Sequence, residues 1–332
     1  MSADSKTAVV AALAGNAVIM VAKFVGFFVS GSGAMFAEAV HTAADVANQA
    51  LLLFGIVRST KAPTEKYQYG FGQERFVWAL ISAVGIFFLG CGVTLMHGID
   101  SLFGEHEPPT HVTMNVVILV VAFFVEGAVL ILAVRSLKKA AEGKPLMHYM
   151  RTEADPSAVA VVLEDSAATL GVLLALASIG LTELTGHTYW DAIGSISIAL
   201  LLGAMAIWLT FRNRELLLGV AAPKAKADAI LAIVNADPTV ERVAMFKTKM
   251  LDTQTYDVLV ELDFYGQKLA EQFRPQLKAR YDEGFDDFES FYAFEQQFAD
   301  DIVELLGDKI DELEAKIKEA VPEVKHIDVE LD

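Results

Sequence analysis

The chain has 332 residues, of which 54% are hydrophobic and 21% charged, and its formal net charge is −17. So acidic a chain, without a basic patch, is not expected to bind nucleic acid. The single cysteine, Cys91, excludes a disulfide framework and a cysteine-based metal site. No nucleophile with a neighbouring base is evident in the sequence, so we do not expect an enzyme.

Long apolar runs dominate the first two thirds of the chain, and each is long enough to cross a bilayer as a helix of about 20 residues. The six runs cover approximately residues 7–29, 33–57, 74–97, 112–135, 157–182 and 190–211. After Arg212 the sequence changes to charged helical patterns and short β-branched runs. We therefore predict a six-helix transmembrane domain over residues 1–212 and a soluble domain over residues 213–332.

The loops between the apolar runs differ in charge. The loops after the second and fourth runs are rich in Lys and Arg, whereas HGIDSLFGEHEPPTH and TELTGHTYWD contain neither. By the positive-inside rule, both termini and the soluble domain lie in the cytoplasm. The first residues lack a basic signal region and an Arg-rich presequence, which favours a bacterial cytoplasmic (inner) membrane.

Polar residues interrupt the second apolar run at helical spacing. In AEAVHTAADVANQALLLFG, residues Glu38, His41, Asp45 and Asn48 are separated by steps of three, four and three. These steps place the four side chains on one stripe of a helix. Because ionisable groups in a bilayer are costly, the stripe should face the bundle interior or a water-filled cavity. It is either a hydrogen-bonding network between helices or, as we favour, part of a metal site.

The fifth run contains two adjacent acids, Glu164 and Asp165. Adjacent side chains on a helix diverge by about 100°, so at most one of them can point straight at the second run. Small residues on both runs allow the two backbones to approach closely, as a shared site requires.

Three other polar residues lie in apolar runs. Lys23 either extends to the membrane surface or pairs with an acid. Glu126 is either a hydrogen-bonding partner inside the bundle or an accessory proton site. Asp191 lies where a carboxylate can cap the beginning of a helix.

These motifs resemble the cation diffusion facilitator family. Its second span has His or Asp followed four residues later by Asp, preceded by a similar AEA. The stretches YGFGQERFVWALISAVGIFFLGCGVTLMHGI and LEDSAATLGVLLALASIGLTELTGHTYWDAIGS are similar to the zinc-transporter-nine-like branch. The resemblance implies a homodimeric antiporter that exports divalent cations, above all zinc, from the cytoplasm in exchange for protons. It also implies that His41, Asp45 and Asp165 are metal ligands.

One position departs from the family pattern. Where relatives have His or Asp, four residues before Asp165, this chain has Val161. Either water completes a three-ligand site, or Glu164, Glu38 or Asn48 supplies the fourth ligand. An oxygen-rich site also admits manganese, iron or cobalt. The metal and the protons would be transported ions, and no cofactor is expected.

A second alternative is a proton-coupled carrier of a non-metal solute, in which the acids relay protons. A membrane scaffold that signals through its soluble domain is a third, disfavoured because that domain shows no kinase, nucleotide or DNA-binding motif.

The order of helical and strand patterns after Arg212 predicts an αββαβ, ferredoxin-like domain. Its second long helix is expected to begin at Asp301. The acidic, aromatic segment near residues 266–300 is longer than a strand–helix connection needs, so we expect a helical insertion there.

Overall fold

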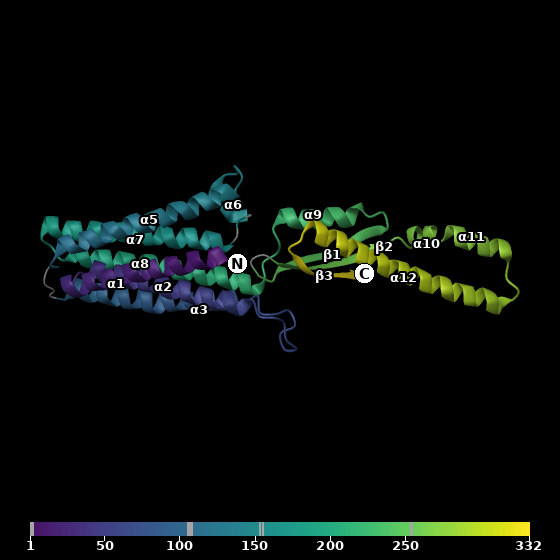
Figure 1. The fold of residues 1–332 in the computed structure, drawn as a ribbon, viewed down its shortest axis with the longest axis horizontal. Coiled ribbons are helices and arrows are strands. Elements are labelled where there is room, and N and C mark those ends of the chain that lie inside the picture. Colours follow the sequence, from purple (N-terminus) through teal and green to yellow (C-terminus); the bar gives the residue numbers. More distant parts are fainter. Residues whose placement is uncertain (1–2, 105–108, 153, 155, 253–254) are drawn as a thin grey trace. The chain divides into compact units, whose positions relative to one another are not determined.

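The structure is a computed structural model that describes every residue except 1–2, 105–108, 153, 155 and 253–254. The chain divides into two compact units, Met1–Leu218 and Gly219–Asp332. Each unit is described separately below (Figure 1).

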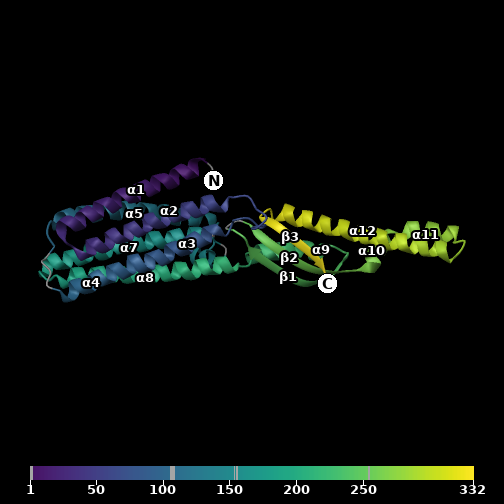
Figure 2. The same ribbon diagram turned by 90° about the horizontal axis from the view of Figure 1, so that it is seen from below.

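The first unit is a bundle of long helices that lie side by side (Figures 1 and 2). Among the described residues, six helical segments are long and apolar enough to span a membrane, and each contains most of one predicted apolar run. They are α1 (Ala3–Ser30), α2 (Gly33–Ser59), a composite segment over Glu74–Phe103, α5 (Val112–Ala140), α7 (Pro156–Thr185) and α8 (Tyr189–Leu218). The predicted six-span bundle is confirmed. The predicted domain boundary at residue 212 lies inside the end of α8.

The third span is irregular, and a short helix follows the fourth. The third span begins as α3 (Glu74–Gly85), passes through a π-helical stretch, Ile86–Val93, and continues as α4 (Thr94–Phe103). The π-helical stretch packs close to α8, where a Cβ on Gly203 would lie 2.8 Å from Cys91 Sγ. The short helix α6 (Leu146–Thr152) lies between α5 and α7.

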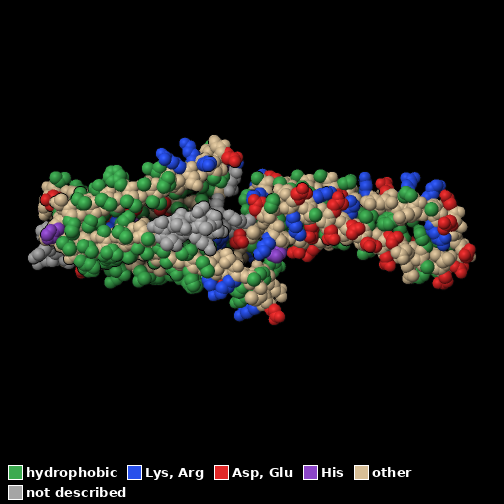
Figure 3. All heavy atoms as spheres, in the orientation of Figure 1, with side chains coloured by type: hydrophobic (Ala, Val, Ile, Leu, Met, Phe, Trp, Pro, Cys, Tyr) green, Lys and Arg blue, Asp and Glu red, His purple; other side chains and the backbone are tan. Residues whose placement is uncertain are grey.

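The bundle core is built mainly from small and branched residues of α2, α7 and α8, such as Ala37, Val172 and Ile198. Small side chains let helix backbones approach closely in a membrane. The outward surface is largely hydrophobic on the visible face, whereas acidic and basic side chains are spread over the second unit (Figure 3). This contrast is expected if lipid surrounds the bundle and water surrounds the second unit.

The second unit has the predicted αββαβ order. Helix α9 (Lys224–Ala236) precedes the antiparallel strands β1 (Val240–Met250) and β2 (Tyr256–Phe264), and β3 (Val324–Leu331) pairs parallel with β2. The strand order is β1-β2-β3, with Val260 opposite Phe246 on one side and Val329 on the other. Alternate β2 residues are buried against α9 and α12 (Phe288–Ala320), because successive strand side chains point to opposite faces.

The insertion is helical, but the long helix starts earlier than predicted. Helices α10 (Gly266–Gln272) and α11 (Arg274–Glu283) lie alongside the first part of α12 (Figures 1 and 2). The expected start of the long helix at Asp301 is wrong, since α12 begins at Phe288. The reason is a capping box: the Asp287 side chain accepts a hydrogen bond from Ser290 N, and the Ser290 hydroxyl accepts one from Asp287 N.

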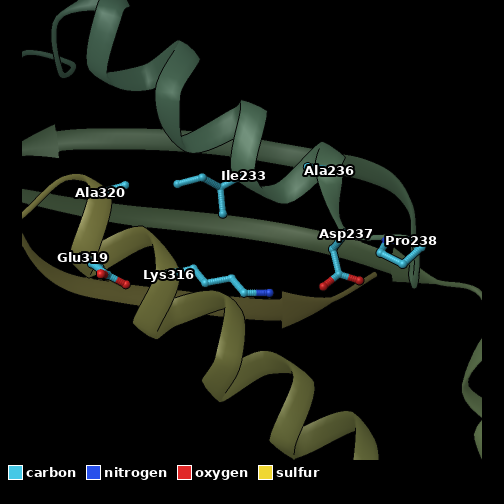
Figure 4. A pocket seen from close by; sticks show the side chains of 7 residues that line it. All are labelled: Ile233, Ala236, Asp237, Pro238, Lys316, Glu319 and Ala320. Carbon is cyan, nitrogen blue, oxygen red and sulfur yellow. The ribbon is translucent and has the colours of Figure 1, made fainter.

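A pocket lies between the end of α9 and the last turns of α12 (Figure 4). Its lining is mainly apolar, from residues such as Ile233 and Ala320. The charged side chains of Asp237 and Lys316 come from opposite sides of the pocket.

Candidate functional site

The polar stripe on α2 begins one turn inside a firmly anchored helix end. Ser32 caps α2 by accepting a hydrogen bond from Met35 N, and it donates its hydroxyl to Asp191 Oδ1 at 2.7 Å. Asp191 also accepts hydrogen bonds from Gly33 N and Ala34 N. Asp191 therefore caps a helix as expected, but the capped helix is α2, although Asp191 itself belongs to the first turn of α8.

His41 and Asp45 lie together on the α2 stripe. His41 Nε2 is 3.6 Å from Asp45 Oδ2, and both residues are within the span. His41 is 3% exposed, while the Asp45 side chain is 26% exposed and so borders a more open region. Imidazole and carboxylate are two of the commonest ligands of zinc, so this pair is suited to bind one ion together.

Helix α7 packs against this stripe at a glycine. A Cβ atom on Gly171 would lie 2.5 Å from Glu38 Oε1 and 3.1 Å from His41 Nδ1. Only a residue without a side chain therefore permits the observed separation of α2 and α7 at the level of His41. The expected close approach of the two helices is present at this point.

Of the two adjacent acids on α7, Glu164 is the one that reaches α2. Asn48 Nδ2 lies 3.1 Å from each Glu164 carboxylate oxygen and donates to them. Asp165 is half-buried, and its Oδ2 is buried without a hydrogen-bond partner among the described residues. Asp45 is close enough to Asp165 for the two carboxylates to interact electrostatically. Val161, one turn earlier on α7, is 44% exposed.

Glu38 forms an ion pair with Lys23 on α1. Lys23 Nζ on α1 lies 2.7 Å from Glu38 Oε2, 2.9 Å from Thr42 Oγ1 and 3.0 Å from Glu126 Oε1. Lys23 thus pairs with acids and does not extend to the membrane surface, and Glu126 is a bonding partner inside the bundle. The other oxygen, Glu38 Oε1, lies 3.8 Å from His41 Nδ1.

The structure brings the six predicted site residues together only in part. Glu38, His41 and Asp45 form one group on α2, and Asn48 joins Glu164 on α7. Within the part of the chain that the structure describes, no three His, Cys, Asp or Glu side chains are close enough to hold a metal ion. Asp165 is therefore not joined to His41 and Asp45 in a ready coordination shell in this conformation.

Sequence reasoning left the role of Lys23 open between two alternatives and named Gly171 only as one of several small residues. Lys23 and Gly171 both contact Glu38, yet neither stands near the stripe in sequence. A lysine inside an apolar run was a usable signal, because it requires a carboxylate partner when it is buried. Gly171 was among the small residues expected to let the two helices approach, but the sequence did not show which of them lies at the contact.

Comparison with known proteins gives a consistent result. Residues 9–218 match the sequence model of the cation efflux transmembrane domain. The chain is 36% identical to metal tolerance protein C4 of Arabidopsis thaliana over 98% of its own length and 73% of the plant protein. It is 32% identical to the mitochondrial proton-coupled zinc antiporter SLC30A9 of Mus musculus over 93% of its length and 55% of the mouse protein. A shorter match, 35% identical over 29% of this chain and 31% of the relative, is to magnetosome protein MamM of Paramagnetospirillum magneticum.

These relatives bear on location as well as family. The chain spans only about half the length of the mouse antiporter. The relatives include a mitochondrial and a plant protein, so they give no support to the expected bacterial inner membrane, whereas a multi-pass membrane protein is supported. With its domain match, its relatives that align over nearly all of this chain and its six apolar helices, the chain belongs to the cation diffusion facilitator family, whose members transport metal cations and are not enzymes.

Proposed function

We propose that this protein exports divalent metal cations, zinc first among them, from the cytoplasm in exchange for protons. The observation that carries the proposal is the pair of buried His41 and partly exposed Asp45 on α2, together with the Asp165 oxygen on α7 that has no hydrogen-bond partner among the described residues. The metal ligands are His41, Asp45 and Asp165, with Glu164 and Asn48 available for the fourth position. Glu38 is left out of this ligand set because one of its carboxylate oxygens already accepts a hydrogen bond from Lys23.

The exchange follows from competition for the same lone pairs. A metal ion needs neutral imidazole and deprotonated carboxylates, so its binding displaces protons, and protonation releases it. Binding also requires Asp165 to approach His41 and Asp45 more closely than in this conformation. A small movement of α7 along α2 supplies that approach, and alternating access places such rocking around a site within the membrane.

The direction of transport rests on the loop charges. The loops after α2 and after α5 contain the Lys and Arg residues, so we place those loops and the soluble unit in the cytoplasm. Assembly as a homodimer is also part of the proposal. The mass of the purified complex, after the mass of bound detergent is subtracted, tests it.

Uptake of metal into proteoliposomes tests the function. With an imposed proton gradient, the parent protein is expected to accumulate zinc and to move protons in the opposite direction. Asp45→Ala and Asp165→Ala should each lower the zinc rate at least 100-fold, since each removes a charged ligand. Glu183→Ala is the matched control, because Glu183 is an exposed acid at the end of α7 and should keep the parental rate.

The same vesicles distinguish the alternatives. Manganese, iron and cobalt are offered beside zinc, because a site with one imidazole and several oxygens suits those ions as well. If one of these ions is transported faster than zinc, that ion and not zinc is the main substrate. Undiminished metal uptake in both alanine variants would refute the site, and proton flux without any metal flux would point to a non-metal solute.

A further inference from the structure

Lys23 is a fully buried cation that the transport mechanism above does not use. It lies within the first span and is 1% exposed. An ammonium group has three N–H donors, and here each finds an oxygen: Glu38 Oε2, Thr42 Oγ1 and Glu126 Oε1, at 2.7–3.0 Å. We call these three acceptors, from α2 and α5, the lysine cage.

Stability alone does not require such a cage. Replacing a buried ion pair with apolar side chains of similar size is often neutral or stabilising, whereas removing one partner leaves an uncompensated charge. Two carboxylates and one ammonium inside a membrane bundle are therefore a costly arrangement, and intramembrane ionisable groups are usually functional.

The cage adjoins the proposed metal ligands. Glu38 Oε2 accepts a hydrogen bond from Lys23, and Glu38 Oε1 lies 3.8 Å from His41 Nδ1, beyond hydrogen-bond distance, with no hydrogen-bond partner for either atom among the described residues. The opposite ring nitrogen, His41 Nε2, faces Asp45 Oδ2. A carboxylate behind a metal-binding histidine holds the ring in orientation and raises its basicity as a ligand. Lys23 thus fixes the carboxylate that lies behind His41.

Without Lys23, the cage would be attractive to metal. Glu38, Glu126 and Thr42 would present three oxygens around a space that now holds a cation. All-oxygen sets with two carboxylates suit hard ions such as Mn²⁺. Two unpaired carboxylates, one of them on Glu38 beside His41, would therefore compete for the transported ion.

We propose that Lys23 is a tethered counter-ion that keeps Glu38 and Glu126 from binding the transported metal and holds Glu38 in place to orient His41. It is a positioning residue that determines specificity, and this role rests on the proposed function. The lysine cage on α2 and α5, occupied by Lys23 of α1, then acts as a permanently filled cation site beside the site that binds and releases the transported metal.

The test compares Lys23→Met, Lys23→Arg and the parent in lipid nanodiscs. Equilibrium dialysis against Zn²⁺ or Mn²⁺ with elemental analysis gives the number of ions bound per chain and their affinities. Lys23→Met should bind one additional Mn²⁺ per chain and bind zinc about 10–100-fold more weakly, as expected when the support behind a ligand is lost. Lys23→Arg keeps the charge and should match the parent. Adding Glu126→Gln to Lys23→Met should remove the additional Mn²⁺.

A folded Lys23→Met protein with the parental Mn²⁺ number and zinc affinity would overturn the proposal. If Lys23→Met does not fold, Glu126→Gln alone decides, because Lys23 then still pairs with Glu38. Parental ion numbers and a zinc affinity within about threefold support the proposal, and a loss above tenfold would show that Glu126 itself binds metal. Failure of the parent to bind or transport metal would instead refute the proposed function.

Discussion

Gly171 offers the sharpest perturbation of the site, because α7 touches both Glu38 and His41 there. In Gly171→Ala, the new Cβ would lie 2.5 Å from Glu38 Oε1 and 3.1 Å from His41 Nδ1. The carboxylate would have to retreat by about 1 Å to reach an ordinary separation of about 3.5 Å. Lys23 holds the same carboxylate at 2.7 Å, so either that ion pair stretches or α7 moves away from α2.

The cost of this variant can be estimated in two parts. Overpacking typically destabilises by about 1–3 kcal/mol, and replacing glycine within a helix returns about 0.5–1 kcal/mol. The net loss of stability is therefore between about 0 and 2.5 kcal/mol. Zinc affinity should also fall, by about 10–100-fold, because the carboxylate behind His41 is displaced.

The assay is zinc binding to reconstituted protein together with thermal unfolding. Gly180→Ala is the matched control, since Gly180 lies on the same helix and its Cβ would have nothing within 4 Å. That control should keep the parental zinc affinity and unfold at the same or a slightly higher temperature. Parental zinc affinity in Gly171→Ala would refute the argument that the α2–α7 contact sets the geometry of His41.

Two further predictions concern stability. Asp191→Ala removes the carboxylate that caps α2, and unfolding should become easier by about 1–2 kcal/mol; thermal denaturation in detergent measures this, and an unchanged midpoint would contradict it. In the second unit, burial and then the charge of Asp328 raise the pKa of Asp257. A carboxyl group whose pKa is higher in the folded than in the unfolded state opposes folding when ionised, and the penalty disappears as pH falls through the folded pKa. Asp257→Asn should therefore raise the melting temperature of this unit at pH 7.5 and raise it less at pH 4; a larger gain at pH 4 would contradict the reasoning.

In the second unit, local sequence patterns predicted the order of the helices and strands but not the start of the long helix. The αββαβ order followed from alternating strand residues such as Val258 and Val260 and from the spacing of apolar residues in the helices. The start of α12 was placed 13 residues too late because residues 266–300 were interpreted as a separate helical insertion, whereas the last of these residues are continuous with α12. The capping box of Asp287 and Ser290 was present in the sequence as Asp and Ser three residues apart, but its Ser at the third position is less diagnostic than Glu.

In the membrane unit, the sequence by itself determined the number of spans and the single stripe of Glu38, His41, Asp45 and Asn48. Both are local properties, because span length follows from the helical rise and the stripe from the helical turn. The sequence also indicated that Glu164 and Asp165 on α7 cannot both point straight at α2, since adjacent residues on a helix do not share one face.

Only the tertiary structure decided which partner each polar group takes. Lys23 pairs with Glu38, 15 residues away, and with Glu126, 103 residues away, and Asn48 selects Glu164 from a distance of 116 residues. Such pairings depend on which helices become neighbours and on how closely Gly171 lets them approach, and no local pattern encodes that distance. The local sequence thus determines which polar residues lie on each helix, while the packing of the helices determines that Lys23 pairs with Glu38 and Glu126 and that Asn48 pairs with Glu164.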